Sequence, residues 1–253
     1  MATAVVLSNL VVLGGKNIPI DEVVSKHPAH VIHVDTSCAD AALPSIVLRS
    51  IRGDVPTTLW WADETCSDLP APLIELSRQL LFDSRRWQDI TKGIRAVESV
   101  LARHRVHCID VNWRRLAPVR HALLHAGDEL RREDLHHSEI RIAYRRGERA
   151  LALLLVGWLA ARMQWDGLPH LDEVEGGDAL LTVDIGVSDE PTTLTLRPPE
   201  LTVNQRGWPP YTIAVRVEDE PTAIAAELKS LHGHPWAREA FLALGRLTSA
   251  ASF

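Results

Sequence analysis

The pattern of apolar residues changes halfway along this chain, and this change limits the possible folds more strongly than any motif does. In the first half, apolar residues come in short, nearly continuous runs, one of which contains Arg49, and such runs are typical of strands buried on both faces. The runs are Val5 to Leu7, Leu10 to Leu13, Val31 to Val34, Ile46 to Ile51 and Thr57 to Trp61. Helices are predicted at residues 19–26, 70–80 and 85–103. This order of strands and helices indicates a small α/β layer structure.

In the second half, apolar and polar residues alternate instead, as in strands with one buried and one solvated face. The alternation runs through residues 140–145, 181–188, 193–197 and 213–218. It predicts an antiparallel sheet, with residues 197–210 as a long loop. A helix over Glu148 to Gln164 is expected to cover this sheet, and two further helices are expected at residues 223–231 and from about Pro235.

The charged stretch from Gly127 to His137 is the best candidate for a boundary between the two halves. We therefore expect an N-terminal α/β domain over residues 1–127, built as a small layered sheet with helices. An α+β domain over residues 138–253, with its antiparallel sheet covered by helices, is expected to follow.

Charge and hydropathy exclude two classes of partner. Lysine and arginine together number 27 against 33 acidic residues, so the net charge is 27 − 33 = −6 and no basic stripe for nucleic acid is present. The longest uncharged apolar stretch, Ala150 to Ala161, is too short to cross a bilayer. Because the N-terminus lacks the basic region of a secretion signal, a cytoplasmic location is expected.

No catalytic, cofactor-binding or metal-binding residue is predicted. The sequence has neither G-x-S-x-G nor a glycine-rich phosphate loop. The histidines at 27, 30 and 33 are interrupted by Pro28, while His104, His107 and Cys108 lack a fourth metal ligand nearby. The cysteines at 38, 66 and 108 form no C-x-x-C pair, so reduced thiols are expected, and whether one of them is a redox switch stays open.

Aromatic composition points to a binding surface or to an unusual core. Eight tryptophans stand against three phenylalanines and two tyrosines, and 23 of the 27 cations are arginine. Tryptophan and arginine are favoured at interface hot spots, although a compositional bias of the genome would also produce this excess of arginine. Since neighbouring strand residues face opposite sides, Trp60 and Trp61 cannot both enter one core layer. Trp208 lies in a proline-rich loop, where exposure is expected.

The segment from Asp110 to Pro118 concentrates an acid, an amide, an indole and two guanidinium groups. Pro118 predicts that a helix begins at about residue 117. In one interpretation Asp110 and Asn112 cap turns while Trp113 closes the core. In the other, Arg114 or Arg115 holds an anion, either a phosphorylated metabolite or a partner's carboxylate.

Three segments in order resemble the successive signatures of the OpcA family, the glucose-6-phosphate dehydrogenase assembly proteins of cyanobacteria and actinobacteria. They are P-T-T-L-W-W at 56–61, D-V-N-W-R-R-L-A-P-V-R at 110–120 and A-L-A-L-L-L-V-G-W-L-A-A-R-M-Q-W at 150–165. The opening strands, the His27-Pro28 turn and the motif Pro235-Trp-Ala-Arg-Glu-Ala extend the likeness.

The resemblance implies a partner protein without catalysis of its own, which binds glucose-6-phosphate dehydrogenase and promotes its active oligomeric state or raises its substrate affinity. The residues expected to contact the partner are Trp60, Trp61, Asp110, Asn112, Trp113, Arg114, Arg115 and Trp208. The alternative is a sugar-phosphate-binding or sugar-phosphate-processing enzyme of the same pathway that uses Arg114, Arg115 and Arg120. Stoichiometry and self-association stay open.

Overall fold

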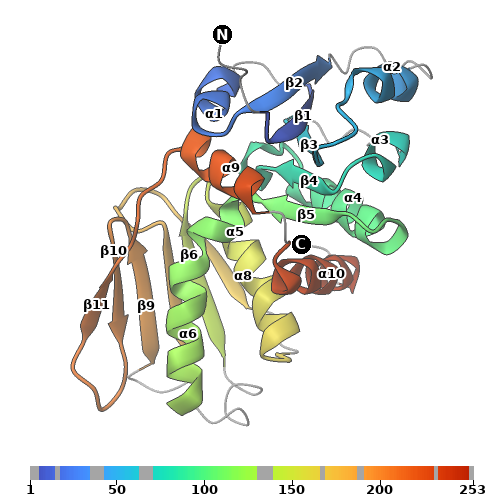
Figure 1. Ribbon diagram of the computed structural model, residues 1–253. Helices are drawn as coiled ribbons and strands as arrows, with labels where there is room; N and C mark the ends of the chain where they lie inside the picture. Colours follow the sequence, from blue (N-terminus) through green and yellow to red (C-terminus); the bar gives the residue numbers. More distant parts are fainter. Residues whose placement is uncertain are drawn as a thin grey trace. The chain divides into compact units, whose positions relative to one another are not determined.

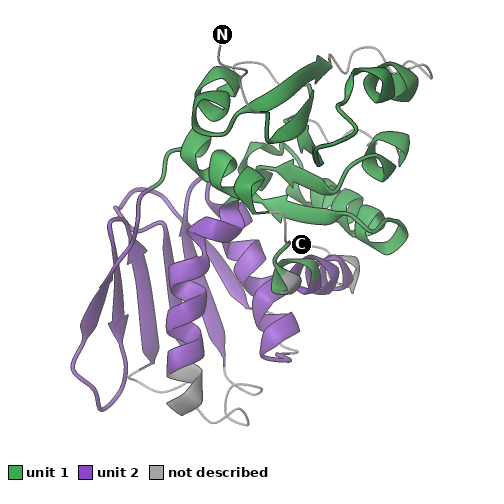
Figure 2. Cartoon of the chain, in the orientation of Figure 1, with its two compact units in different colours: residues 1–111, 218–238 green, residues 112–217, 239–253 purple. Residues whose placement is uncertain are grey.

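The computed structural model describes residues 6–14, 18–34, 43–62, 71–129, 139–165, 169–186, 191–230 and 233–250. Two compact units make up the chain (Figure 2). Unit 1 contains residues 1–111 and 218–238, and unit 2 contains residues 112–217 and 239–253. The chain leaves unit 1 after residue 111, runs through unit 2 and returns to unit 1 for residues 218–238.

Unit 1 is built on a five-stranded parallel sheet with the order β2-β1-β3-β4-β5 (Figure 1). Its strands are β1 (Ser8–Leu13), β2 (Ala29–Val34), β3 (Thr57–Trp61), β4 (Gln79–Phe82) and β5 (His107–Asp110). The connecting helices are α1 (Ile20–Lys26), α2 (Leu43–Ser50), α3 (Ala71–Glu75), the 3-10 turn η1 (Ser84–Arg86) and α4 (Ile90–Arg103). The sheet and its crossover helices confirm the α/β prediction for the first half.

Helix α9 (Glu220–Lys229) comes from the far end of the sequence and completes the core of unit 1. Ala223, Ile224 and Leu228 pack with Leu10 and Trp60 in one buried cluster. Asp219 caps the helix by accepting a hydrogen bond from the backbone N–H of Thr222 at 2.8 Å.

Unit 2 is built on a six-stranded sheet with the order β11-β10-β9-β8-β6-β7. Its strands are β6 (Ile140–Arg145), β7 (His170–Val174), β8 (Leu181–Ile185), β9 (Thr192–Arg197), β10 (Glu200–Asn204) and β11 (Tyr211–Ala214). Every neighbouring pair is antiparallel except β6 and β7, which are parallel. The antiparallel prediction is therefore correct for five of these strands, and β7 makes the sheet mixed.

Two helices of unit 2, α6 (Ala117–Glu129) and α8 (Arg149–Arg162), lie against its sheet (Figure 1). The short helix α5 (Val111–Arg115) precedes α6, and α10 (Pro235–Ala250), whose first turn lies in unit 1, comes last in the chain. Helix α8 is buried along its length from Ala150 to Leu159. A Cβ on Gly157 would lie 2.4 Å from the backbone oxygen of Ala240, so α8 and α10 approach closely at this glycine.

Several predicted elements were wrong in detail. The run Ile46 to Ile51 is not a strand, because residues 43–50 form α2 with only Val47 buried, while Ile46 and Leu48 are exposed. The helix predicted at residues 70–80 ends at Glu75, and Gln79–Phe82 is strand β4. The expected loop at residues 197–210 contains strand β10.

Candidate functional site

The double tryptophan at the end of β3 serves two core layers of unit 1. Trp60 belongs to the cluster that contains α9 residues, whereas Trp61 contacts Phe82 and Trp87 at ring-centroid distances of 6.5 and 5.6 Å. The prediction that the two indoles face different layers is confirmed. Both side chains are 2% exposed and pack within unit 1.

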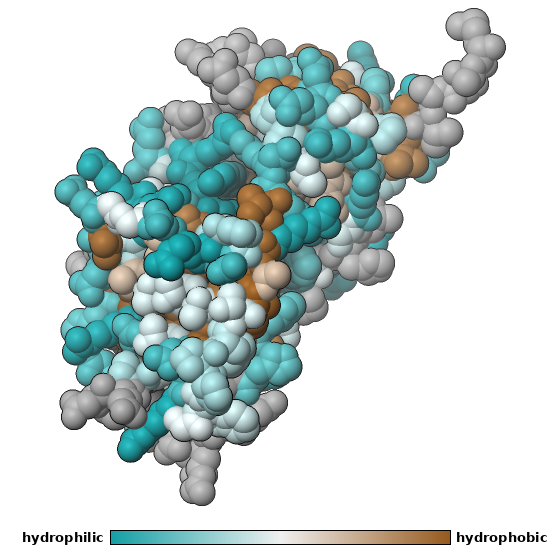
Figure 3. All heavy atoms as spheres, turned by 90° about the vertical axis from the view of Figure 1, so that its left-hand side faces the viewer, coloured by the Kyte–Doolittle hydropathy of each residue, from teal (hydrophilic) through white to brown (hydrophobic). Residues whose placement is uncertain are grey.

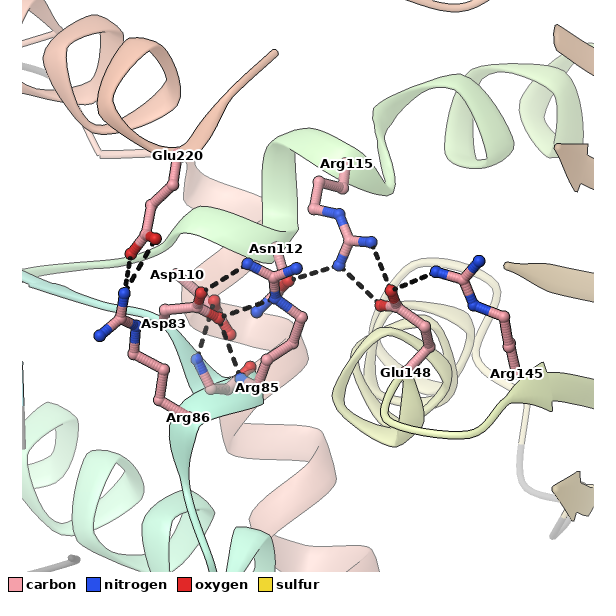
Figure 4. A network of polar contacts seen from close by, with 10 residues as sticks. Asp83, Arg85, Arg86, Asp110, Asn112, Arg115, Arg145, Glu148 and Glu220 are labelled. Atoms are coloured by element: carbon pink, nitrogen blue, oxygen red, sulfur yellow. Dashed lines mark hydrogen bonds and ion pairs between the residues drawn. The ribbon is translucent and has the colours of Figure 1, made fainter. Parts of the chain in front are cut away.

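Polar residues gather where β4 and β5 end. Asp83 caps the turn η1 and binds Arg85 through Oδ2 at 2.9 Å, while the backbone N–H of Ser84 donates to Asp110 Oδ1 at 3.4 Å (Figure 4). Arg86 forms two hydrogen bonds with Glu220, at 2.6 and 2.8 Å. These contacts anchor the end of β4 to β5 and to the start of α9. Sequence reasoning missed Asp83, Arg86 and Glu220, because Glu220 lies far from the other two residues in the sequence and no local pattern links them.

The Asp110–Pro118 segment contributes buried side chains as well, among them Asn112 and Trp113. In unit 2, Arg115 holds the buried Glu148 through two hydrogen bonds of 2.7 Å each, and it also donates to Asn112 Oδ1 at 3.0 Å (Figure 4). Arg145 adds a contact of 3.5 Å to Glu148. Because Arg115 forms an ion pair with Glu148, the anion that Arg115 binds is a carboxylate of this chain.

Arg120 is also used within unit 2. Its guanidinium carbon lies 3.9 Å from the centroid of the Trp113 ring, and Nη2 donates to the Trp113 carbonyl at 3.2 Å. Burial lowers the pKa of Arg120 to about 10, which still leaves the group charged at neutral pH. The stacking locks the start of α6 against α5.

Burial therefore separates the eight predicted contact residues into two groups. The first group is at most 2% exposed and packs or bonds within the chain: Trp60, Trp61, Asp110, Asn112 and Trp113. Arg114 and Arg115 are partly exposed. Trp208 is 60% exposed, as expected for its loop.

The face of the unit 2 sheet that lies opposite its buried side chains is rich in threonine. The strand register places Ala143, Thr182, Thr195, Thr202 and Thr212 side by side in one row across five strands. The charged residues Arg141, Asp184 and Arg197 lie in flanking rows of this face. A neutral row with charges around it is the arrangement of many protein interfaces. We call this surface the threonine face.

An apolar edge adjoins the β10–β11 hairpin. Trp208 and Tyr211 are exposed there, and β11 is the last strand of the sheet. Figure 3 views the molecule from the side on which β11 lies in Figure 1, and pale and brown side chains gather over this part of unit 2. Sequence reasoning found Trp208 but not the threonine face, which depends on strand register.

The histidines and cysteines give no metal centre in the part of the chain that is described. No three His, Cys, Asp or Glu side chains there are grouped to hold an ion. His27, His30 and His33 instead bond separately to Ser8, Ser50 and Gly14. Cys108 is a buried free thiol whose pKa burial raises to about 12. Cys38 and Cys66 lie outside the described residues.

Among the helices that the structure describes, none is both long enough and apolar enough to cross a bilayer.

Comparison with solved structures identifies the architecture. An oxidoreductase from Sinorhizobium meliloti superimposes with a TM-score of 0.51 and 12% sequence identity, over 95% of this chain and 87% of that one. At this identity the likeness concerns the fold alone, which is a parallel sheet domain combined with a larger mixed sheet.

Sequence relatives are named putative OxPP cycle protein OpcA. The Nostoc punctiforme relative is 28% identical over 151 residues, which cover 58% of this chain and 32% of the relative. The Synechococcus elongatus relative is 27% identical over 146 residues, covering 54% and 31%. The chain thus matches about a third of the length of these relatives.

A family profile matches more than half of the chain. The family is described as the C-terminal domain of the glucose-6-phosphate dehydrogenase subunit, and the match spans residues 106–241. The matched region contains the Asp110–Arg120 and Ala150–Trp165 segments, with the buried Arg115–Glu148 pair and the buried helix α8. With this match and the relatives above, the chain belongs to the OpcA family.

Proposed function

We propose that this chain binds glucose-6-phosphate dehydrogenase and promotes its active oligomeric state in the oxidative pentose phosphate pathway, without catalysis of its own. The observation that carries this proposal is the family match over residues 106–241, whose description names a subunit of that dehydrogenase. The names of the cyanobacterial relatives, which place them in the OxPP cycle, support the same pathway. A cytoplasmic site of action, expected from the sequence, is part of this proposal.

The threonine face of unit 2 is the proposed docking surface for the dehydrogenase. Its central row presents small side chains and no charge, so that covering it leaves no ion unpaired. The flanking charged residues remain at the rim, where they set orientation and association rate rather than affinity.

Trp208 extends this surface at the β10–β11 hairpin. An indole that is largely exposed in the free chain gains much apolar burial when a partner covers it, and tryptophan is enriched at hot spots. Of the residues singled out in the sequence, Arg114 and Arg115 remain candidates for peripheral contacts, since both are partly exposed.

A kinetic titration tests the function. The cognate dehydrogenase is assayed against glucose 6-phosphate with increasing amounts of this chain, and its oligomeric state is followed by gel filtration. We expect a larger species and a saturable change in the response to glucose 6-phosphate at the same chain concentrations. A dehydrogenase whose elution and kinetics are unchanged at saturating chain contradicts the proposal.

A charge placed on the threonine face tests the surface. Thr195→Lys puts an ammonium group in the centre of the neutral row, and Ser25→Lys places the same group on an exposed turn of α1 in unit 1. Burying an unpaired charge costs several kcal/mol, so Thr195→Lys is expected to weaken the complex at least about tenfold. The Ser25→Lys chain should bind like wild type. Equal affinity of the two variants would mean that the dehydrogenase binds to another surface of the chain.

A further inference from the structure

A cavity of about 360 Å³ lies in unit 1, between the start of β5 and the start of α10. Five of the residues that line it carry basic side chains: His104, Arg105, His107, His234 and Arg238. No acidic residue is among its lining residues in the described chain. The volume lies near the lower end of the range for small-molecule pockets.

Two segments more than 120 residues apart in sequence build this cavity, and a glycine lets them meet. A Cβ on Gly233 would lie 2.6 Å from Nδ1 of His107, so only glycine leaves room for the imidazole at this place. Arg238 donates from Nη2 to the carbonyl of Leu101 at 2.7 Å. This hydrogen bond ties the first turns of α10 to the end of α4 and fixes the direction of the guanidinium group.

Carboxylates contact the cavity's histidines from outside its lining. Glu75 lies 3.9 Å from His104, and the buried Glu227 lies 3.7 Å from His234. Neither carboxylate is part of the lining, in which the five basic residues are joined by Val106, Cys108 and Gly233. Arg105 and His107 are exposed, so a ligand that enters the cavity can reach these two side chains.

The chemistry of this lining fits a tetrahedral oxyanion. Guanidinium groups donate paired N–H bonds to phosphate oxygens, and an imidazole supplies at least one N–H donor in either protonation state. We propose that this cavity binds a phosphoryl group, from inorganic phosphate or from the phosphate ester of a small metabolite. The proposal is independent of the dehydrogenase partner, because the cavity lies within unit 1 and needs no second protein.

Calorimetry on the whole chain, without the dehydrogenase, tests this site. Inorganic phosphate, glucose 6-phosphate and succinate are titrated separately at constant ionic strength and near neutral pH. We expect saturable binding of at least one phosphoryl compound, with succinate bound at least about tenfold more weakly because it lacks the tetrahedral oxygens. Tighter binding of glucose 6-phosphate than of phosphate identifies a metabolite site, and the reverse order identifies a site for free phosphate.

Matched variants assign the binding to the cavity. The double variant Arg105→Gln with His107→Gln removes two exposed donors, and Arg52→Gln removes an exposed arginine of unit 1 that does not line the cavity. The double variant should lose at least about tenfold in affinity, as expected for charge-assisted hydrogen bonds, while Arg52→Gln keeps wild-type affinity. Because both altered side chains are exposed, thermal unfolding should stay close to wild type.

Three results overturn the proposal. The first is the failure of phosphate and glucose 6-phosphate to bind at millimolar concentration. The second is equal binding of succinate. The third is an unchanged affinity in a folded double variant, or an equal loss of affinity in the Arg52→Gln chain. Either result would show that Arg105 and His107 are not responsible for the binding.

Discussion

Taken one by one, the distinctive side chains of this protein bond and pack within the chain itself. Arg115 neutralises the buried Glu148, and Arg120 stacks on the buried Trp113. Of the two interpretations of the Asp110–Pro118 segment, the core interpretation describes the buried Trp113, while the buried Asn112 accepts a hydrogen bond from the side chain of Arg115. The tryptophan residues likewise include core residues, namely Trp60, Trp61, Trp87 and Trp158. Trp208 and Trp236, by contrast, are exposed.

Gly157 provides a sharp test of the packing between α8 and α10. Gly157→Ala places a methyl group against the backbone oxygen of Ala240 and the Cβ of Leu244, which cannot move aside easily. We expect a loss of about 1–3 kcal/mol in the free energy of unfolding, measured with urea. Gly53→Ala is the control, because a Cβ there has open space and the backbone does not adopt a positive φ. A chain that tolerates both substitutions equally contradicts the close approach of these helices.

Cys108 is expected to resist alkylation. Burial raises its pKa to about 12, so the reactive thiolate is scarce in the folded chain at mildly alkaline pH. Iodoacetamide labelling, read at the Cys108 peptide by mass spectrometry, should be slow in buffer and fast in urea. The raised pKa also stabilises the fold by an amount that is present below about pH 8.5 and is lost as the pH rises towards the folded pKa. Equal labelling rates in the two solvents would show that the thiol is accessible.

Among the secondary-structure elements, α9 shows how unit 1 depends on a distant part of the chain. Ile224 is fully buried against β1 and β3 residues, whereas Ile46 of α2 is 56% exposed. Ile224→Ala should cost about 2–5 kcal/mol, because it removes buried methyl groups and leaves a cavity, and Ile46→Ala should cost little. Urea unfolding of the two variants measures the difference. Comparable stabilities would mean that α9 is not part of the unit 1 core.

Periodicity predicted the elements whose pattern is long or strongly alternating. The helices at 149–162 and 90–103, and the strands at 140–145 and 181–185, lie close to their expected places. Residues 46–51 failed because a short apolar run does not distinguish a buried strand from a helix. Strand β4 has only four residues, and the predicted helix at residues 70–80 extends over its first two.

The candidate sites were less predictable than the elements. Exposure of Trp208 followed from the prolines around it, which is a local signal. The threonine face depends on the register of five strands, and the basic cavity joins residues 104–108 to residues 233–238. Such long-range pairings leave no trace in local patterns, so neither surface could be recognised from the sequence.

For the molecule as a whole, the proposed function depends on an exposed surface that a partner covers. Trp208→Ala should weaken the complex with the cognate dehydrogenase about tenfold or more, as hot-spot tryptophans do, in a direct binding titration. Trp236→Ala removes another exposed indole, on α10, and should leave the affinity unchanged. If Trp236→Ala has the larger effect, the binding surface includes the start of α10 instead.

Sedimentation velocity of the chain mixed with its cognate glucose-6-phosphate dehydrogenase decides whether the two proteins form a complex at all. We predict that they sediment together as one faster species, in a stoichiometric ratio, and that the dehydrogenase oligomer is larger in the mixture than alone. Two independent boundaries, each at the position of the separate protein across the concentration range, would contradict the proposed function.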